Sequence, residues 1–307
     1  MPNSKILIFG GTGQVGFELQ RKLATVGQIV GIGGPRVDFS RADLIRAAVR
    51  AAEPAVIVNA AAYTAVDKAE REPELAAAVN GVAPGVLAEE ARRLGCLLVH
   101  YSTDYVFDGA KQGPYLETDT PNPLNVYGRT KLAGDEAILA VGGDALILRT
   151  TWVYGPRGSN FLLTMLRMAK ERPELRIVDD QIGAPTSSEA IAQATAEILA
   201  RILAPAGGGL QGRGGIYNLT CAGETSWFGF AKSFLTTEAQ LSGTKLPNLI
   251  PIKTSEFPRP AKRPANSRLS CRRLEETFGV RMPTWEAALG RVFDTLREGN
   301  GQASGPA

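Results

Sequence analysis

Histidine is the scarcest chemistry-bearing residue in this chain of 307 residues, because His100 is the only one. A single histidine leaves little room for a histidine-rich metal site or a Ser-His-Asp triad. The three cysteines, Cys96, Cys221 and Cys271, are widely spaced and form no CxxC pair. This sparse pattern indicates a reduced, cytoplasmic location. If the chain is an enzyme, a residue other than histidine must transfer protons.

Long apolar runs and a charge excess are also absent. No run of about 18 apolar residues occurs, so no transmembrane helix is expected. The first residues, MPNSKILIFGG, enter a strand pattern at once and leave no room for a signal peptide. The 34 Lys and Arg residues nearly balance the 31 Asp and Glu residues, which gives a net charge of +3. We therefore expect partners other than nucleic acid or a membrane.

The first half of the chain alternates short apolar runs with helical stretches. Runs that are apolar on both faces are typical of buried parallel strands. Their alternation with helices predicts an α/β fold with a Rossmann-type doubly wound parallel sheet. The expected strands are Ile6–Phe9, Ile29–Ile32, Ala55–Val58, Cys96–Tyr101 and Ala145–Leu148. The expected helices are Gln14–Val26, Arg41–Ala52, Glu74–Leu94 and Tyr127–Val141.

After Arg149 the pattern loosens, and helical stretches are separated by segments rich in proline and glycine. We predict a domain at residues 1–150, a smaller C-terminal lobe at 151–298 that returns elements to the core, and a disordered tail at 299–307. Residues 204–215 (APAGGGLQGRGG) predict a flexible surface loop. The expected helices are Asn160–Glu171, Ser188–Leu203, Thr225–Gln240 and Trp285–Arg297.

A glycine-rich loop follows the first expected strand directly. Gly10, Gly13 and Gly16 form a GxxGxxG pattern that opens the first helix. Small residues permit a tight turn, and the helix start presents N–H groups to a pyrophosphate, so this context predicts dinucleotide binding. After the second strand, the acid typical of NAD binding is missing. Arg36 either binds a 2′-phosphate, which favours NADPH over NADH, or is a solvated loop charge.

A tyrosine and a lysine form a YxxxK motif at the start of the helix after the fourth strand. Tyr127 and Lys131 share one helical face. A nearby ammonium favours the phenolate, so Lys131 should lower the pKa of Tyr127 from about 10. Such a tyrosine can protonate a carbonyl without histidine. Thr103, at the end of the fourth strand, either binds the same carbonyl oxygen or only caps the strand.

Together, Thr103, Tyr127 and Lys131 behind the glycine loop resemble the extended short-chain dehydrogenase/reductase superfamily. Longer strings narrow the resemblance to the dTDP-4-dehydrorhamnose reductase family, over roughly residues 5 to 297. These strings are NAAAYTAVDKAE at 59–70, STDYVFDG at 102–109, PLNVYG at 123–128, RTTWVYG at 149–155, DQIGAPT at 180–186 and RPANSRL at 263–269.

The resemblance implies that NADPH or NADH gives a hydride to C4 of dTDP-4-dehydro-L-rhamnose, yielding dTDP-L-rhamnose. It implies that Tyr127 protonates the resulting oxyanion. Lys131 would bind the nicotinamide ribose and lower the tyrosine pKa, and Thr103 would orient the carbonyl. The cofactor would lie on the domain at 1–150 and the sugar nucleotide mainly on the lobe at 151–298.

The resemblance also implies two sets of binding residues. Within the second set, Asp67 could equally be a solvated residue at a helix start, and Trp152 could pack in the core. The implied cofactor contacts are Gly10, Gly13, Gln14, Val15, Asp38, Phe39, Ala62, Tyr63, Thr64, Tyr127 and Lys131. The implied substrate contacts are Val66, Asp67, Thr103, Asp104, Tyr127 and Trp152.

Charged residues elsewhere leave further alternatives open. The segment Lys253–Arg273 holds seven basic residues against Glu256 alone, and it is either a diphosphate-binding segment or ordinary surface. Some family members form dimers with magnesium held by acidic residues. Glu18 and Glu189 match two such positions and Asp294 lies one position from a third. Because surface carboxylates are the simpler interpretation, we predict no metal site and leave a homodimer and Mg²⁺ open.

Two rival functions stay open at this point. One is a dehydratase or epimerase of the same superfamily, but dehydratases usually carry an acid pair after the strand-end threonine, and here Thr103 is followed by Asp104 and Tyr105. The other is a non-catalytic subunit like the regulatory subunit of methionine adenosyltransferase. Such a subunit need not keep Thr103, Tyr127 and Lys131. We interpret His100 as a packed or hydrogen-bonded strand residue, with a minor supporting role open.

Overall fold

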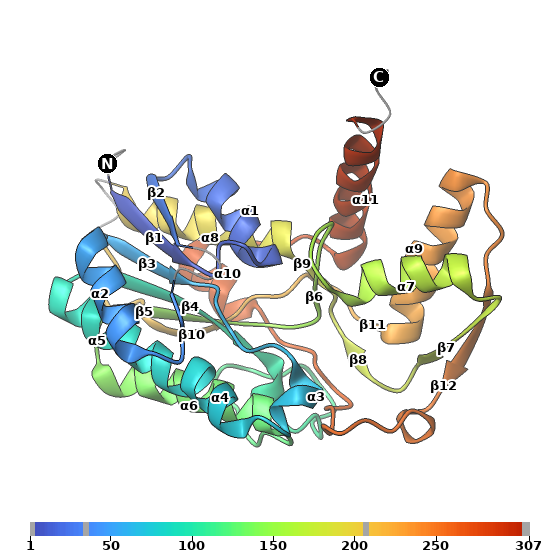
Figure 1. The fold of residues 1–307 in the computed structure, drawn as a ribbon, viewed down its shortest axis with the longest axis horizontal. Coiled ribbons are helices and arrows are strands. Elements are labelled where there is room, and N and C mark those ends of the chain that lie inside the picture. Colours follow the sequence, from blue (N-terminus) through green and yellow to red (C-terminus); the bar gives the residue numbers. More distant parts are fainter. Residues whose placement is uncertain (1–3, 33–36, 205–208, 303–307) are drawn as a thin grey trace.

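A six-stranded parallel sheet forms the centre of the computed structural model, which describes residues 4–32, 37–204 and 209–302 (Figure 1). Its strands are β1 (Lys5–Phe9), β2 (Gln28–Ile32), β3 (Val56–Asn59), β4 (Leu97–Thr103), β5 (Ala145–Thr150) and β10 (Gly215–Asn218). They lie in the order β10-β5-β4-β3-β1-β2, and every neighbouring pair is parallel. The chain changes direction across the sheet between β1 and β3, where sheets of this kind bind ligands. The predicted doubly wound sheet is confirmed.

Apolar side chains on both faces hold the sheet between two layers of helices (Figure 1). In β1, Ile6 and Ile8 belong to one core and Leu7 and Phe9 to the other, as the alternation of strand side chains requires. The first core is closed by α1 (Gln14–Leu23), α8 (Ser188–Leu203) and α10 (Arg272–Phe278). The second is closed by α2 (Ala42–Ala52), α5 (Ala83–Leu94) and α6 (Val126–Val141).

The predicted helix Glu74–Leu94 is helical throughout but not uniform. It consists of α4 (Pro73–Ala77), a π-helical turn at Ala78–Val82, and α5. Pro84 has no N–H group, so it cannot close the α-helical bond to Asn80, and a wider turn is found there. The turn buries the side chain of Asn80, which bonds to the loop at 62–64.

The smaller part of the molecule combines three helices with short strand pairs beside the main sheet (Figure 1). The helices are α7 (Phe161–Glu171), α9 (Trp227–Ser242) and α11 (Trp285–Gln302). The longest strand pair is parallel and joins β7 (Glu174–Val178) to β12 (Asn248–Ile252). The other pairs are β6 (Val153–Tyr154) with β9 (Thr186–Ser187) and β8 (Ile182–Gly183) with β11 (Thr225–Ser226). Buried aromatic residues, including Phe230, Phe234 and Trp285, form its core.

Residues after position 150 contribute to both parts, since α8, α10 and β10 complete the larger layer. The predicted boundary at 150 stays a prediction. Helix α11 runs to Gln302, so the predicted start of the tail at 299 is too early, and residues 303–307 lie outside the described residues. Likewise, the predicted loop at 204–215 ends where β10 begins, and its residues 205–208 are not described. In the described ranges, no helix is long and apolar enough to cross a membrane.

Candidate active site

The glycine loop lies directly against the carboxyl end of β3. Gly10 has a φ of +76°, and a Cβ there would lie 2.6 Å from the backbone of Ala60 and Ala61. A Cβ on Gly16 would lie 2.1 Å from the carbonyl oxygen of Gly10. Gly13, the N-cap of α1, offers no side chain to the first-turn N–H groups. This side-chain-free cradle at a helix start suits a diphosphate group.

Gln14 and Val15 begin α1, and both are half-buried. The Gln14 side chain donates to the carbonyl oxygen of Val153 at 3.3 Å and accepts from the Asn160 amide at 3.3 Å. Val15 packs against the first core. Gln14 therefore links the glycine loop to the segment that leads into α7.

Asp38 and Phe39 lie between β2 and α2. The Asp38 carboxylate accepts hydrogen bonds from the Ser40 hydroxyl and backbone N–H at 2.7 and 2.8 Å, which lower its pKa. The Phe39 ring packs edge-on against Phe9, with ring centres 5.2 Å apart. Arg36, on which the predicted preference for NADPH depends, lies outside the described residues.

The loop at 62–64 is pinned by the π-helical turn. The Asn80 side chain accepts from the backbone N–H of Tyr63 at 2.8 Å and donates to its carbonyl oxygen at 3.0 Å. The same amide lies 3.3 Å from the hydroxyl of Thr130 in α6. The Tyr63 phenol donates to Glu72 at 2.7 Å. Asn80 thus couples this loop to α6, the helix that carries Tyr127. In the sequence, Pro84 is the only signal of the π-helical turn that buries Asn80.

Thr103 and Tyr127 come together where β4 ends and α6 begins. The Asn125 side chain caps α6 by accepting from the N–H of Gly128 at 2.7 Å. A Cβ on Gly128 would lie 2.2 Å from the carbonyl oxygen of Tyr105, so glycine lets the helix approach the turn after β4 closely. Thr103, at the end of β4, and Tyr127, in the first turn of α6, therefore lie beside one another.

The environment of Tyr127 differs from the expectation. Burial raises the pKa of Tyr127 to about 12, and the carboxylates of Asp104 and Asp135 add to the rise. The predicted lowering by Lys131 is wrong for this structure, because the lysine Nζ turns to β4. There it lies 2.7 Å from the carbonyl oxygen of Tyr101 and 3.0 Å from the Nε2 of His100. Burial also lowers the pKa of Lys131 to about 8.

Asp104 is a buried carboxyl group beside the Thr103 hydroxyl, which donates to it at 3.2 Å. Burial raises the pKa of Asp104 to about 7, and the neighbouring hydroxyls of Ser267, Thr151 and Thr103 offset this only in part. A carboxyl group with this pKa is partly protonated at neutral pH. It therefore adds a second titratable proton next to Tyr127.

Asp67, in α3 (Val66–Ala69), is ion-paired rather than solvated. It accepts two hydrogen bonds from the Arg263 guanidinium, at 2.8 and 3.0 Å, and one from the N–H of Ala261 at 3.2 Å. Partial burial opposes ionisation of Asp67, but the hydrogen bonds from Arg263 and Ala261 and the charges of Arg263 and Arg259 together outweigh it and lower the pKa. This ion pair fixes α3 against the basic segment Lys253–Arg273.

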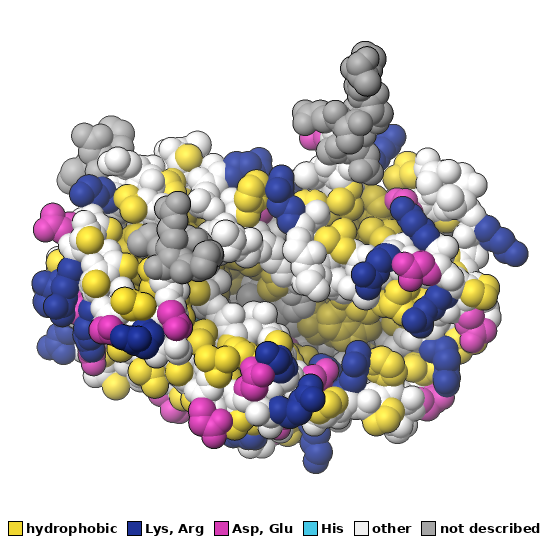
Figure 2. Space-filling model, in the orientation of Figure 1, with side chains coloured by type: hydrophobic (Ala, Val, Ile, Leu, Met, Phe, Trp, Pro, Cys, Tyr) yellow, Lys and Arg dark blue, Asp and Glu magenta, His cyan; other side chains and the backbone are white. Residues whose placement is uncertain are grey.

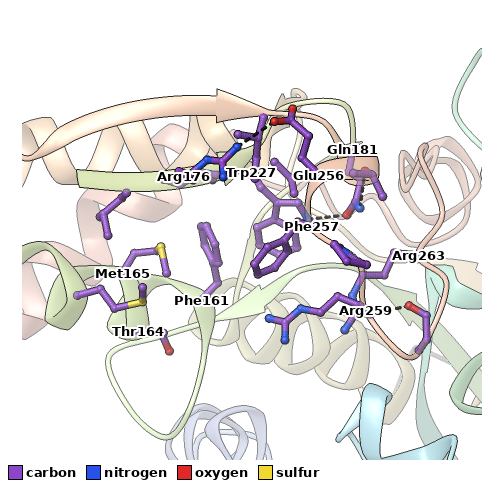
Figure 3. Close-up of a pocket in the computed structure, with 18 of the residues that line it drawn as sticks. Phe161, Thr164, Met165, Arg176, Gln181, Trp227, Glu256, Phe257, Arg259 and Arg263 are labelled. Carbon is purple, nitrogen blue, oxygen red and sulfur yellow. Dashed lines mark hydrogen bonds and ion pairs between the residues drawn. The ribbon is translucent and has the colours of Figure 1, made fainter. Parts of the chain in front are cut away.

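A cavity of about 840 Å³ is lined by residues of the smaller part and of the segment Ile252–Arg263, and Tyr105 reaches it from the turn after β4. Figure 2 shows this hollow with hydrophobic side chains inside it and Lys and Arg side chains near its rim. Figure 3 shows Phe161 and Trp227 directed into the cavity, with Arg259 and Arg263 facing them. Trp152 stacks on Trp227 with ring centres 3.7 Å apart. Its φ of +46° is a strained backbone conformation for a tryptophan.

Some side chains of the basic segment Lys253–Arg273 line this cavity, and others lie elsewhere. Of its seven predicted candidates, Arg259, Lys262 and Arg263 line the cavity. The others include Arg268, paired with Glu224, Arg272, paired with Glu276, and Arg273, placed over the Tyr217 ring. The cavity also gains two arginines that the sequence gave no reason to select, Arg172 and Arg176.

Glu18 and Glu189 serve as ion-pair partners within the chain. Glu18 pairs with Arg21 at 2.8 Å, and Glu189 lies 2.6 Å from Lys22 and 3.4 Å from Arg291. These contacts tie α8 to α1 and α11. Among the described residues, no group of three or more His, Cys, Asp or Glu side chains is placed to hold a metal ion.

The parallel sheet and the glycine loop define a Rossmann-type α/β protein, whose structural neighbours are NAD(P)-binding reductases and epimerases. The chain belongs to the family described as "RmlD substrate binding domain", whose model matches residues 4–298.

Several relatives of this chain share a name. The dTDP-4-dehydrorhamnose reductase of Burkholderia thailandensis is 50% identical over 289 residues, which cover 93% of this chain and 97% of the relative. The Escherichia coli K12 protein of the same name is 43% identical over 297 residues, which cover 95% and 97%. A crystal structure of the Bacillus anthracis dTDP-4-dehydrorhamnose reductase in complex with NADP superposes with a TM-score of 0.86, at 33% identity, and covers 95% of this chain and 99% of that one.

Proposed function

We propose that this chain is an NAD(P)H-dependent oxidoreductase that reduces dTDP-4-dehydro-L-rhamnose at sugar C4 to dTDP-L-rhamnose. The observation that carries the proposal is the grouping of Thr103 and Tyr127 at the sheet edge that also bears the glycine loop. The relatives that share most of this chain's length are named for that activity, which supports it. Three unpaired thiols fit a protein that works in the cytoplasm.

The cradle for the cofactor lies at the switch point of the sheet. Gly13 would lie against the diphosphate, the backbone N–H groups of Gln14 and Val15 would bind it, and Asp38 with Phe39 would flank the adenine. The loop at 62–64, held by Asn80, would run along the cofactor. NADP in the Bacillus anthracis structure supports NADPH as the cofactor, with NADH as the alternative.

Tyr127 is placed to transfer the proton. The bound cofactor supplies a hydride to the carbonyl carbon, so the carbonyl oxygen gains negative charge and needs a proton. With a pKa of about 12, Tyr127 holds its proton at neutral pH and has it available for that oxygen. The Thr103 hydroxyl would hydrogen-bond the same oxygen as its charge develops. Lys131 would bind the nicotinamide ribose.

The cavity beside Tyr105 fits the rest of a sugar nucleotide. Its volume of about 840 Å³ lies within the usual range for small-molecule sites. The pyrimidine would stack near Trp227 and Phe161, with Trp152 supporting the stack. Arg259 and Lys262 offer positive charge to the diphosphate, while Arg263 is already engaged by Asp67. Val66, Asp67 and Asp104 would border the sugar.

Oxidation of NADPH and NADH with enzymatically generated dTDP-4-dehydro-L-rhamnose tests the proposal. We expect oxidation of the reduced nicotinamide in step with formation of dTDP-L-rhamnose, faster with NADPH. No oxidation with either cofactor would overturn the assigned reaction. A parallel reaction with a stable dTDP-hexose lacking the 4-dehydro group tests the rival, because its conversion to a 4-dehydro-6-deoxy sugar would identify a dehydratase.

A further inference from the structure

Asp104 is a buried carboxyl group without a cation beside it. Only 3% of its surface is exposed. Its neighbours in the described part of the chain are the hydroxyls of Thr103, Thr151 and Ser267, and no cation lies among them. A buried carboxylate without a cation is costly, and a carboxyl group avoids this cost by keeping its proton. The surroundings therefore favour the neutral acid, in agreement with the raised pKa described above.

The two oxygens of Asp104 differ in the acceptors that they meet. Oδ2 is buried and has no hydrogen-bond partner among the described residues. Oδ1 lies 3.2 Å from the hydroxyl oxygen of Thr103. A buried O–H group needs an acceptor, and Thr103 offers one to Oδ1. The proton of the neutral acid therefore belongs on Oδ1, from which it points to Thr103.

The Thr103 hydroxyl has one proton and two lone pairs to share among its neighbours. One lone pair accepts from the backbone N–H of Tyr105 at 3.2 Å, at the start of a 3₁₀ turn (Asp104–Val106). When Asp104 is ionised, the hydroxyl proton goes to the carboxylate and is not available to a substrate. When Asp104 is protonated, the second lone pair accepts from Oδ1, and the same contact reverses. The hydroxyl proton is then free for a carbonyl oxygen beside Tyr127.

The other titratable groups near Asp104 stay uncharged or lie further from Thr103. Tyr105 packs edge-on against Tyr127 of α6, with ring centres 5.7 Å apart. Burial raises the pKa of both phenols, so both keep their protons near neutral pH. Asp104 is thus the group bonded to Thr103 whose charge changes near pH 7. The remaining neighbours in the described residues are the hydroxyls of Thr151 and Ser267, the ion pair of Asp67 and Arg263 around Tyr105, and, further along α6, Asp135 with Arg149.

We propose that Asp104 is a positioning residue for the reduction: as a neutral acid it donates from Oδ1 to Thr103, and this turns the Thr103 hydroxyl proton toward the carbonyl oxygen of the substrate. The inference rests on the proposed function, because that carbonyl belongs to the sugar that Tyr127 would protonate. Ionisation of Asp104 takes the Thr103 proton back and places a negative charge close to the forming oxyanion. Both effects slow the reaction, so activity should fall as the pH rises through the pKa of Asp104.

The pH profile of kcat/KM for the sugar nucleotide tests the proposal, because this constant reports the enzyme before the sugar binds. For the unaltered chain we expect a fall above about pH 7, roughly tenfold per pH unit. Asp104→Asn keeps a donor for Thr103 and cannot ionise. Its profile should stay level to about pH 8, where Lys131 titrates. The same fall near pH 7 in the folded variant would overturn the proposal.

Asp104→Leu is the matched variant, because leucine is of similar size but has no donor for Thr103. It cannot ionise either, so its profile should also be level near pH 7. Its kcat at about pH 6 should lie at least about tenfold below that of Asp104→Asn, since only the asparagine turns the Thr103 proton to the substrate. Unfolding midpoints show that both variants are folded. Equal kcat values in the two folded variants would contradict the proposal.

An experiment without substrate separates this inference from the proposed function. NMR follows the ¹³C signals of labelled aspartate carboxyl groups from about pH 4 to about pH 9, and Asp104→Asn identifies the Asp104 signal by its loss. We expect a midpoint near pH 7 for Asp104. This result would support the inference whether or not dTDP-4-dehydro-L-rhamnose is the substrate. A midpoint near about pH 4, the value of a solvated aspartate, would overturn it.

Discussion

Asp67 and Arg263 form a two-pronged ion pair across 196 positions of sequence, with hydrogen bonds of 2.8 and 3.0 Å. The pair joins α3, beside the loop at 62–64, to the segment that lines the cavity. Figure 3 shows Arg263 and Arg259 together on this wall. The pair holds α3 against the segment that lines the cavity.

A double-mutant cycle of Asp67→Asn and Arg263→Gln should give a coupling free energy of about 1–2 kcal/mol in urea unfolding. This lies between the values of exposed and buried ion pairs. The exposed pair of Arg176 and Glu256 is the control, and its coupling should be below about 1 kcal/mol. Because the pKa of Asp67 is lowered by folding, its contribution is present above about pH 4 and is lost as the pH falls further. Equal coupling in both pairs would contradict this account.

Trp227→Ala should raise the KM for the sugar nucleotide by about 5- to 150-fold, because loss of a stacked base costs about 1–3 kcal/mol. The value of kcat should change much less, because a ribose and a diphosphate separate the base from the reacting sugar carbon. Trp227→Phe keeps an aromatic face and should recover part of the loss. Steady-state kinetics of both variants measure KM and kcat. An unchanged KM in Trp227→Ala would show that the base does not bind in this part of the cavity.

Asp104 predicts a fall in stability with rising pH. Its folded pKa of about 7 exceeds the unfolded value of about 3.9, so the folded state holds the extra proton between these two values. The free energy of unfolding should therefore decline from about pH 4 to about pH 7, by roughly 1–4 kcal/mol from this group. Asp104→Asn cannot ionise and should flatten that decline. Parallel slopes for the two proteins in urea unfolding across this range would show that Asp104 does not titrate as the structure indicates.

Gly16→Ala should destabilise the protein by at least about 2 kcal/mol, because the new Cβ would lie 2.1 Å from the carbonyl oxygen of Gly10. It should also weaken NADPH binding, since the cradle must move. Gly290→Ala is the control, because its Cβ meets nothing within 4 Å on helix α11. That variant should gain about 0.5–1 kcal/mol from helix propensity. Urea unfolding and fluorescence titration with NADPH compare the two.

The parts of the site that could be predicted are those encoded locally. The glycine loop between β1 and α1 and the YxxxK start of α6 each lie in one short stretch, and their positions on the sheet follow from element order. The strand β10 was missed because its four residues follow a glycine-rich stretch and give no periodic pattern. Helix α4 to α5 was predicted, but its π-helical turn depends on the buried Asn80.

The partners of Lys131 and Asp67 could not be read from spacing. Lys131 turns to His100 because β3, β4 and α6 meet there, and the pKa of Tyr127 follows from burial that no local motif reports. Arg263 is one of seven basic candidates in its segment, and only the fold shows that its guanidinium is paired with Asp67. Arg172 and Arg176 reach the cavity from α7's end and β7, far from the basic segment in sequence.

The role of Tyr127 is the central claim, and Tyr127→Phe tests it most directly. NADPH oxidation with dTDP-4-dehydro-L-rhamnose should fall by about 10²- to 10⁴-fold in kcat, the usual contribution of a positioned proton donor. NADPH affinity and the unfolding midpoint, measured on the same protein, should stay near those of the unaltered chain. Near-normal turnover by the folded variant would contradict the assignment of Tyr127 as the proton donor.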